Sequence, residues 1–201
     1  HSIVAWGYNA DGQCDVPDPN EGFIAISAGG GHSLGLRSDG SIAAWGLNDD
    51  GQCNVPEPNS GYVAIAAGGY HSLALRADGS IVAWGDSSWT ARNTPPPSGR
   101  FTAIAAGNYV SVGLREDGSV VVWGLVNPTI HAVPIPNADF VAVSATRSSC
   151  IGLKSDGSVV CWGVRDDGET NLSPDNSGFV AVSACDKRMM ALRVTGSIET
   201  W

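Results

Sequence analysis

The chain has 201 residues, of which 43% are hydrophobic and 26 are glycine, and its formal net charge is −9. This apolar content is sufficient for one globular domain with many tight turns. The acidic charge, with Lys154 and Lys187 as the only lysines, argues against nucleic acid and anionic membranes as partners. No segment reaches the roughly 20 consecutive apolar residues of a membrane span. We therefore expect a soluble protein, and the sequence does not distinguish a secreted from a cytoplasmic one.

A tryptophan followed by glycine recurs every 39 residues along the chain. These residues are Trp6, Trp45, Trp84, Trp123 and Trp162, and the terminal Trp201 lies on the same grid. A constant period over five copies indicates a chain built from stacked supersecondary units. We divide residues 1–201, as a single domain, into repeats of about 7–45, 46–84, 85–123, 124–162 and 163–201.

Each repeat contains two apolar runs that predict neighbouring strands. The first runs are residues 23–28, 62–67, 101–106, 140–145 and 179–184. Their residues are apolar or small at every position, as expected for a strand that is covered on both faces. The second runs are residues 33–37, 72–76, 111–115, 150–154 and 189–193. Large and small residues alternate there, so one face fills space and the other lets a neighbouring sheet approach.

An Asp-Gly pair follows the second run in four repeats, at residues 39–40, 78–79, 117–118 and 156–157. Such a pair between two strands predicts a type I′ hairpin turn. The returning third strand then ends at the repeated tryptophan. Proline-containing segments such as residues 13–17 and 52–56 are candidates for a fourth, outer strand, because proline is tolerated at a sheet edge.

Small sheets that are apolar on both faces must be covered on both sides, and radial repetition achieves this. The sequence therefore predicts an all-β fold, a five-bladed β-propeller with three or four antiparallel strands per blade. An open β-solenoid is the alternative, but its coils are shorter and lack a hairpin in each turn. Ser2–Trp6 is an extra copy of the third strand and a candidate to close the ring. Glu199 and Thr200 are polar, so we expect Ser197–Trp201 to be the less buried of these two copies.

Residues 66–85, Ala-Ala-Gly-Gly-Tyr-His-Ser-Leu-Ala-Leu-Arg-Ala-Asp-Gly-Ser-Ile-Val-Ala-Trp-Gly, resemble the repeat of the regulator of chromosome condensation family. The element Trp-Gly-x-Asn-x-x-Gly-Gln-x-x-Val-Pro at residues 6–17 and 45–56 is especially similar to the short bacterial repeats of β-lactamase inhibitory protein II. The third to fifth repeats depart from this pattern in their loops. The resemblance implies a propeller, seven-bladed in the best-known members, whereas this chain has material for five blades.

The resemblance also implies that variable loops of successive blades gather at one end and contact a protein partner. Carried over position by position, the loop between the first two strands contributes Gly31, Tyr70, Tyr109, Ser148 and Lys187. The loop after Trp-Gly contributes Tyr8, Asn9, Leu47, Asn48, Asp86, Trp89, Asn127, Arg165 and Asp166. We expect Tyr70, Tyr109 and Trp89 to be the anchors, because rigid exposed aromatic residues dominate binding hot spots. The alternative is that they only plug the mouth of the channel.

The repeated residues are predicted to be structural. The five Trp-Gly tryptophans are expected to be core residues or spacers between blades. His32 and His71 are one repeat apart, so they lie on neighbouring sheets about 10 Å apart, too far to share a metal ion. Asx-rich loops at residues 9–12, 48–51 and 165–168 fit turns better than calcium sites. The five cysteines, an odd number, do not make a complete disulfide framework.

No catalytic motif is present in the sequence, so we predict no enzymatic activity, no metal and no cofactor. The favoured function is a non-enzymatic protein-binding scaffold, inhibitor-like or adaptor-like, with variable loops on one face. A carbohydrate-binding propeller is the alternative, in which Trp89 or the tyrosines stack on sugars. A nucleotide-exchange role rests on the family name alone.

Overall fold

The computed structural model describes residues 1–86, 99–124, 132–163, 175–185 and 188–201, which form strands and no helix. Five three-stranded antiparallel sheets follow one another along the chain. Blade 1 holds β1 (Phe23–Ala28), β2 (His32–Arg37) and β3 (Ile42–Gly46); blade 2 holds β4 (Tyr62–Ala67), β5 (His71–Arg76) and β6 (Ile81–Gly85). Blade 3 holds β7 (Phe101–Ala106), β8 (Val110–Arg115) and β9 (Val120–Gly124); blade 4 holds β10 (Phe140–Ala145), β11 (Ser149–Lys154) and β12 (Val159–Gly163). Blade 5 holds β13 (Phe179–Cys185), β14 (Arg188–Arg193) and β15 (Ile198–Thr200).

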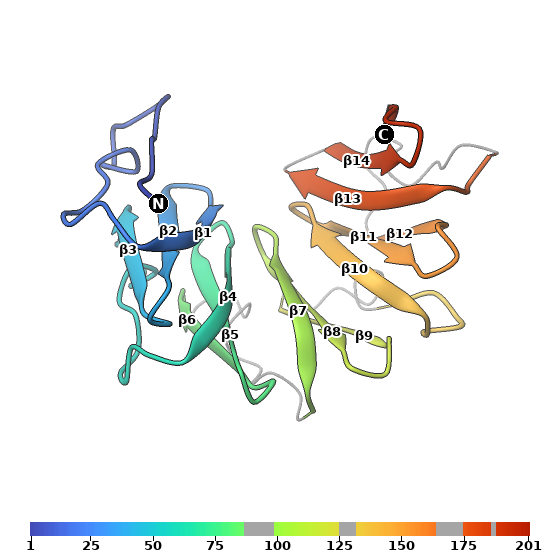
Figure 1. Ribbon diagram of the computed structural model, residues 1–201, viewed down its shortest axis with the longest axis horizontal. Coiled ribbons are helices and arrows are strands. Elements are labelled where there is room, and N and C mark those ends of the chain that lie inside the picture. The colour runs from blue at the N-terminus through green and yellow to red at the C-terminus, as the bar shows by residue number, and fades with distance from the viewer. Residues whose placement is uncertain (87–98, 125–131, 164–174, 186–187) are drawn as a thin grey trace.

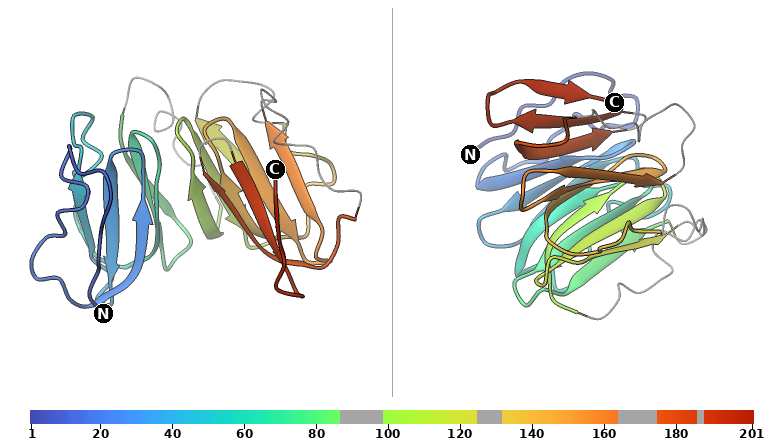
Figure 2. Two further views of the ribbon diagram at one scale, coloured as in Figure 1. Left: turned by 90° about the horizontal axis from the view of Figure 1, so that it is seen from above. Right: turned by 90° about the vertical axis from the view of Figure 1, so that its right-hand side faces the viewer.

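The blades form a curved array around a common centre, and blades 1 and 5 lie on either side of a gap in Figure 1. The middle strand of each blade pairs with both of the others. The first strands of consecutive blades contact one another, so they line the inner side of the array. Figure 2 shows the sheets standing side by side rather than stacked along a line, which excludes the solenoid alternative. The fold is the predicted all-β propeller arrangement with five blades.

Each first strand begins with a β-bulge after its aromatic residue, as between Phe23 and Ala25 in β1. The same register shift occurs in all five sheets. A bulge re-aims the side chain beside it, and here the aromatic ring lies beneath the cation that ends the second strand. The guanidinium of Arg37 is 4.8 Å from the ring centre of Phe23, and Arg193 is 4.3 Å from that of Phe179. These cation–π contacts tie the first two strands of each blade together.

The Asp-Gly hairpins form, but the predicted type I′ turn is wrong. Gly40 has a φ of 80°, whereas the φ of Asp39 is not positive. A type I′ turn needs a positive φ at both central residues. Gly40 N–H donates to Arg37 O, and Arg37 N–H donates to Ser41 O. This is the three-residue hairpin loop, in which glycine supplies the left-handed residue after a type I turn. Asp39 Oδ1 accepts hydrogen bonds from the backbone and the hydroxyl of Ser41, which rigidify the turn.

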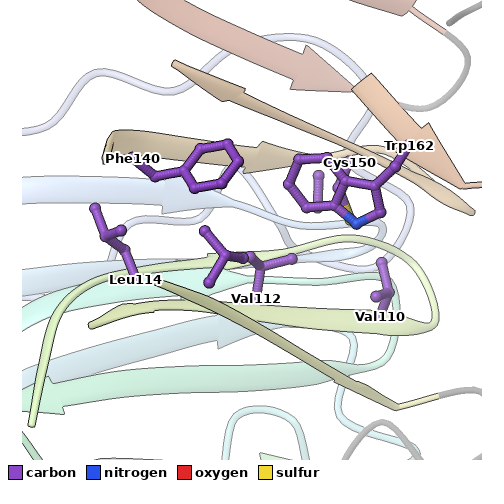
Figure 3. Packing of buried hydrophobic residues seen from close by; sticks show 8 residues of the cluster. Val110, Val112, Leu114, Phe140, Cys150 and Trp162 are labelled. Atoms are coloured by element: carbon purple, nitrogen blue, oxygen red, sulfur yellow. The ribbon is translucent and has the colours of Figure 1, made fainter. Parts of the chain in front are cut away.

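Packing between blades forms the hydrophobic core. Figure 3 shows Val110, Val112 and Leu114 of β8 facing Phe140 and Trp162 of blade 4. The two valines are fully buried and Leu114 is 4% exposed. Blade 1 packs on blade 2 through the same register positions, with Leu34 and Leu36 in one cluster with Tyr62, Ala67 and Trp84. Alternate residues of each middle strand therefore belong to the interface with the next blade.

An asparagine clamp joins neighbouring blades at the outer strand. The side chain of Asn59 accepts from the N–H and donates to the C=O of Ile42, at 2.8 and 2.9 Å. The same two-bond contact recurs at intervals of one or two repeats, in the pairs Asn20–Ile3, Asn137–Val120 and Asn176–Val159. The clamp satisfies backbone groups at a strand end and fixes the height of one blade against the next.

Buried histidines join blades 1, 2 and 3. His32 Nε2 lies 2.9 Å from Ser72 Oγ, and His71 Nε2 lies 3.0 Å from Ser111 Oγ. Because Ser72 Oγ donates to the Gln52 carbonyl, the imidazole of His32 is the donor to Ser72. The Nδ1 atoms of both histidines are buried and have no hydrogen-bond partner among the described residues. Each imidazole has a hydrogen-bond partner at Nε2 and none at Nδ1 within the described part of the chain, so a second N–H would be buried without an acceptor. Each ring is therefore neutral.

The outer segments correct three expectations. Residues 13–17 and 52–56 form no strand, and each described sheet has three strands. Ser2–Trp6 forms no strand either, and Trp6 is 84% exposed, whereas Trp201 is half-buried beside β14. Only the tryptophan is better covered in Ser197–Trp201, because β15 pairs with β14; each copy has two half-buried and three exposed residues, so Ser197–Trp201 is not the less buried copy. Trp45, Trp84, Trp123 and Trp162 are at most 9% exposed, so Trp6 alone departs from the predicted core role.

We predict a loss of stability below pH 6.5 that depends on His32 and His71. Burial, the main cause, lowers the pKa of each from 6.5 to about 4. The unfolded chain therefore takes up protons before the folded chain does. The stabilisation is complete above pH 6.5 and declines as the pH falls towards 4, by up to about 3 kcal/mol for each histidine. Urea unfolding at a series of pH values between 7.5 and 4.5 measures this decline.

The matched variant is His32→Val combined with His71→Val, because blade 3 carries Val110 at the equivalent position. Its stability should change much less over the same pH range. The turn aspartates, such as Asp39, have lowered pKa values because of their serine hydrogen bonds, so they titrate below this window. An equal pH dependence in the parent chain and the variant would contradict the assignment.

A second prediction concerns Gly107, at the point where blades 3 and 4 approach most closely. A Cβ added there would lie 1.8 Å from the carbonyl oxygen of Thr146, a backbone atom that cannot move alone. Gly107→Ala should destabilise the fold by about 2 kcal/mol or more. Gly31→Ala is the control, because the added Cβ meets side chains and no backbone atom, Leu47 at 3.1 Å and Asp11 at 3.7 Å. Chemical denaturation compares the two, and equal midpoints would refute the steric argument.

Candidate functional site

The connections between the first and second strands lie together at one end of the array. Backbone bonds join consecutive connections, from Gly30 N–H to Gly68 O at 3.0 Å and from Gly69 N–H to Gly107 O at 3.2 Å. These glycines are required, because a Cβ at Gly30 would lie 2.9 Å from Gly69 O. The inner ends of all five blades surround a central cavity of about 250 Å³. The connections of blades 1, 2 and 3 are thus tied to one another at the rim of this cavity.

Three side chains from consecutive blades form a row on this rim, which we call the aromatic row: Tyr70, Tyr109 and Arg147. The rings of Tyr70 and Tyr109 stack with their centres 6.1 Å apart and their planes 25° apart. The guanidinium of Arg147 lies 5.6 Å from the ring centre of Tyr109. Stacking and cation–π contacts of this kind contribute about 0.5–1.5 kcal/mol each. The row is held in place by its own members before any partner binds.

The aromatic row is accessible to a partner. Tyr70 is 39% exposed, Tyr109 is half-buried and Arg147 is exposed. The arrangement offers a flat apolar surface on Tyr70 with a cation two blades away. Such a surface can pack against an apolar side chain and pair with a carboxylate.

In the two loops after Trp-Gly that the structure describes, at residues 6–17 and 45–56, the predicted binding asparagines hold their own loops together. Asn48 Oδ1 accepts from Cys53 N–H at 2.8 Å, and its Nδ2 donates to Asn54 Oδ1 at 3.0 Å. Asn9 makes the equivalent bonds to Cys14 and Asp15. Both asparagines are exposed, but their amides are used to fold their own loops. Gln52 supports the second loop from below, since its buried side chain accepts from Asp50 N–H.

Two predicted binding residues are not members of the aromatic row: Asp86 is bonded to its backbone, since Asp86 N–H donates to Tyr70 O at 2.9 Å, and Tyr8 lies at blade 1. Asp86 is only 7% exposed, so its predicted place on the accessible face is wrong. Asp86 follows the buried Gly85 directly. Desolvation of Asp50 is the main cause that raises the pKa of that carboxyl group, and the negative charge of Asp86 raises it further. Tyr8 is 75% exposed and lies with Trp6 in a cavity on the open face of blade 1. Trp89, Arg165 and Asp166 lie outside the described residues.

Arg147 was missed in the sequence because it precedes the predicted rim position, Ser148, by one residue. Its equivalents are Gly30, Gly69 and Asn108. The usable signal is the change from glycine, which the crowded blade contacts require, to a long side chain in the fourth repeat. A Cβ at Gly69 would lie 2.9 Å from Asn108 Cα. The close contact at Gly69 thus accounts for glycine at this position in the second repeat.

In the described part of the rim, chemical groups that suggest catalysis or metal binding are not gathered together. Within the described ranges, no three His, Cys, Asp or Glu side chains lie close enough to hold a metal ion. Burial raises the pKa of the Cys161 thiol to about 12 and also raises that of Cys150, so neither is a thiolate at neutral pH. No helix capable of crossing a membrane occurs in the described part of the chain.

Comparison with known proteins supports the repeat assignment. The model of the regulator of chromosome condensation (RCC1) repeat matches residues 23–52, 62–88 and 101–127. No curated protein sequence matches the chain significantly.

Solved structures match over the whole array. The chain is similar to the ectodomain of the receptor kinase CR4 from Physcomitrella patens, with 26% identity and a TM-score of 0.79 over 98% of this chain and 55% of that chain. It is also similar to the CRINKLY WD40 ectodomain of the receptor kinase ACR4 from Arabidopsis thaliana, with 26% identity and a TM-score of 0.76 over 98% and 70%. Prp20p from Saccharomyces cerevisiae has the same fold, with 18% identity and a TM-score of 0.74 over 89% and 56%.

The chain thus spans between half and three-quarters of the length of these structures. The three segments that match the RCC1 repeat model follow the 39-residue period of the chain, and the chain has the β-propeller fold of these similar structures.

Proposed function

We propose that the protein is a non-enzymatic binding scaffold whose aromatic row receives a protein partner. The observation that carries the proposal is the stacked pair Tyr70–Tyr109 with Arg147 at its end, on a rim fixed by backbone bonds between blades. Aromatic residues and arginine dominate interface hot spots, and a preorganised site loses little entropy on binding. The partner that fits offers an apolar side chain to Tyr70 and a carboxylate to Arg147.

The charge distribution favours a partner with both signs on its surface. Arg147 supplies a cation on the rim, whereas the whole chain carries a net charge of −9. Asp49 and Asp50, in the loop after the first repeat, are exposed. A basic region on the partner would be steered by this acidic field, while its carboxylate would select Arg147.

A carbohydrate ligand is the second candidate, since sugars stack on exposed aromatic faces. The geometry favours it less. Tyr109 contacts Tyr70 on one neighbouring blade and Arg147 on the other, so its ring is largely occupied. Within the aromatic row Tyr70 alone offers an open aromatic surface, and Asn9 and Asn48 use their amides within their own loops. A sugar site needs several free hydrogen-bonding groups around the stacked ring.

The similar structures agree with a role in protein recognition. The yeast protein Prp20p is described by its binding to Gsp1p and histones, and CR4 and ACR4 are receptor ectodomains. A nucleotide-exchange role would require a surface that recognises a nucleotide-binding protein. No feature of the aromatic row favours such a partner over other proteins. Residues 6–17 and 45–56 are predicted to be similar to the repeats of β-lactamase inhibitory protein II. If this prediction is correct, the partner is an enzyme and the protein inhibits it.

We predict that Tyr70→Ala combined with Tyr109→Ala removes partner binding and leaves folding intact. Loss of one hot-spot aromatic residue costs about 2 kcal/mol or more of binding free energy, so the double variant should weaken binding at least about 30-fold. The free energy of unfolding should change by only about 1 kcal/mol, because both rings are on the surface. Affinity capture with quantitative mass spectrometry, together with urea unfolding, measures both quantities.

Val63→Ala is the control variant, since Val63 is 52% exposed on β4 and lies away from the rim. Proteins captured by the parent chain and by this control, but lost with the double variant, are the expected result. A glycan array with the same three proteins tests the alternative. Sugar binding that depends on Tyr70, without any protein partner, would reverse the proposal.

A further inference from the structure

The end of the array opposite the rim carries the hairpins between the second and third strands, and we call it the hairpin end. Phe23 pairs with Arg37 beside the hairpin turn and Ala28 pairs with Ser33 near the rim, so each first strand runs from the hairpin end to the rim. At each junction between blades, the turn glycine accepts a backbone hydrogen bond from the aromatic residue that opens the next first strand. These bonds, 2.9 to 3.1 Å long, join Gly40 to Tyr62, Gly79 to Phe101, Gly118 to Phe140 and Gly157 to Phe179.

The residue that follows each of these aromatic residues is exposed. Val63 and Val141 are 52% exposed and Val180 is 53% exposed. Thr102 is exposed as well, and its hydroxyl donates to Leu114 O, which leaves its methyl group for apolar contacts. Each of the four lies in a β-bulge and has no partner in the ladder. Because Val63, Thr102 and Val141 belong to blades with a neighbour on either side, their exposure results from the bulge and not from a missing blade.

A turn aspartate of the preceding blade lies beside each of these exposed residues. Asp39 directly precedes Gly40, which is bonded to Tyr62, and Val63 follows Tyr62 in the chain. The same arrangement brings together Asp78 with Thr102, Asp117 with Val141 and Asp156 with Val180. Each junction therefore presents one carboxylate and one apolar group side by side.

Each of these carboxylates has one oxygen that the turn does not use. Oδ1 of Asp39 accepts from the backbone and the hydroxyl of Ser41, and the other three aspartates make the same bonds to the serine two residues further on. Among the described residues, Oδ2 of these aspartates has no hydrogen bond. The serine bonds, as the main cause, lower the pKa of all four carboxyl groups, which are therefore negatively charged at neutral pH.

The cations that end the second strands are engaged elsewhere. Arg37 Nη2 donates to Pro19 O and Lys154 Nζ donates to Pro136 O, both in connections that precede a first strand. The equivalent arginines of blades 2 and 3 lie over aromatic rings, 5.2 and 5.8 Å from the ring centres. A partner that approaches the exposed valines therefore meets the turn aspartates beside them.

The pair of a carboxylate and an apolar group is repeated at four successive junctions of the hairpin end. Because the first strands of consecutive blades contact one another, the four pairs adjoin. Arg100, an exposed cation at this end, lies 3.8 Å from Glu116, which offsets its charge. Single exposed apolar residues are common on protein surfaces, but a regular series of them on a base tied by backbone bonds is expected of an interaction surface.

We propose that the hairpin end is a second binding surface, which receives an extended basic segment of another protein. Apolar side chains of the segment pack on Val63, Thr102 and Val141, and its lysines or arginines pair with the turn aspartates. Charge selects this partner, since the surface offers four carboxylates in a chain of net charge −9. The spacing agrees, because four extended residues span about 13 Å and packed sheets lie about 10 Å apart. The aromatic row lies at the other end, so this proposal does not depend on the proposed function.

The probe is a fluorescent peptide with four repeats of Lys-Ser-Val-Ser, which places lysine and valine in turn on one face of an extended chain. Fluorescence anisotropy during titration with the full 201-residue chain measures its binding. Binding should be detectable below about 1 mM and should weaken as the salt concentration rises, because exposed ion pairs are screened. Absence of binding up to that concentration at low salt would overturn the proposal.

The charge contribution is tested by combining Asp39→Asn, Asp78→Asn and Asp117→Asn. Asparagine keeps the Oδ1 atom that accepts the serine bonds of the turn and removes the negative charge. This triple variant should bind the peptide about tenfold more weakly, since each exposed ion pair contributes a small factor.

The matched control removes the same charge from the loops after Trp-Gly, by Asp11→Asn, Asp49→Asn and Asp50→Asn. All three aspartates are exposed and lie outside the hairpin end. This control should bind the peptide within about twofold of the parent chain. An equal loss of binding in the two triple variants would mean that an acidic protein attracts the peptide without a site, and would overturn the proposal.

The apolar contribution is tested by Val63→Ser combined with Val141→Ser. Both side chains are exposed, so the fold should be unaffected, and binding of the Lys-Ser-Val-Ser peptide should weaken about tenfold. Val4→Ser is the control, since Val4 is 77% exposed and lies outside the first strands. A peptide of Lys-Ser-Ser-Ser repeats should bind the parent chain and the double variant equally weakly. Equal affinity of the parent chain for the two peptides would leave the valines without a role and overturn the proposal.

The rim variant separates this surface from the aromatic row. Tyr70→Ala combined with Tyr109→Ala should bind the basic peptide as the parent chain does, because the two rings lie at the other end of the blades. Loss of peptide binding in that variant would place the peptide at the rim and overturn the proposal. Circular dichroism and urea midpoints of each variant, compared with the parent chain, show that a loss of binding is not a loss of fold.

Discussion

The contact between consecutive blades is the interaction on which the rest of the structure depends. A three-stranded sheet with two apolar faces cannot be stable alone in water, because each face must leave water against something else. Here alternate residues of a middle strand, such as Val110 and Val112, provide that cover for the next blade. The asparagine clamp and the histidine–serine bonds add direction to this nondirectional contact. The curvature of the array follows from repeating one contact in one register.

The repeat separates residues that hold the fold from residues that are free to bind. Positions at the blade contacts tolerate little change, since a Cβ at Gly107 would collide with the backbone of the next blade. The rim positions have no such neighbour, and they vary from Gly31 to Tyr70, Tyr109 and Ser148. Because the backbone beneath them is tied from blade to blade, this variation changes the chemistry of the surface and not its shape. Tyr70, Tyr109 and Arg147 can therefore form a row although they are far apart in the sequence.

Sequence reasoning succeeded where one repeat suffices to define the local structure. Apolar runs, Asp-Gly pairs and the 39-residue period identify the strands, the hairpins and the number of blades. It failed where the result depends on a neighbour. The hairpin turn needs positive φ at Gly40 alone, because the loop has three residues and not two. Asp86 has a loop-like sequence position but is buried, and the role of Asn59 is visible only when Ile42 of the previous blade is placed beside it.

Trp6 shows why a repeat position does not determine an environment. It has the same motif, Trp-Gly, as Trp45 and Trp84, and it is the exposed member of the set. Burial of these tryptophans requires a middle strand beside their own strand, as Trp84 is paired with Ser72. Ser2–Trp6 lacks that strand but keeps its clamp to Asn20. The environment of a repeated residue is therefore set by the strand that pairs beside it and not by its own motif.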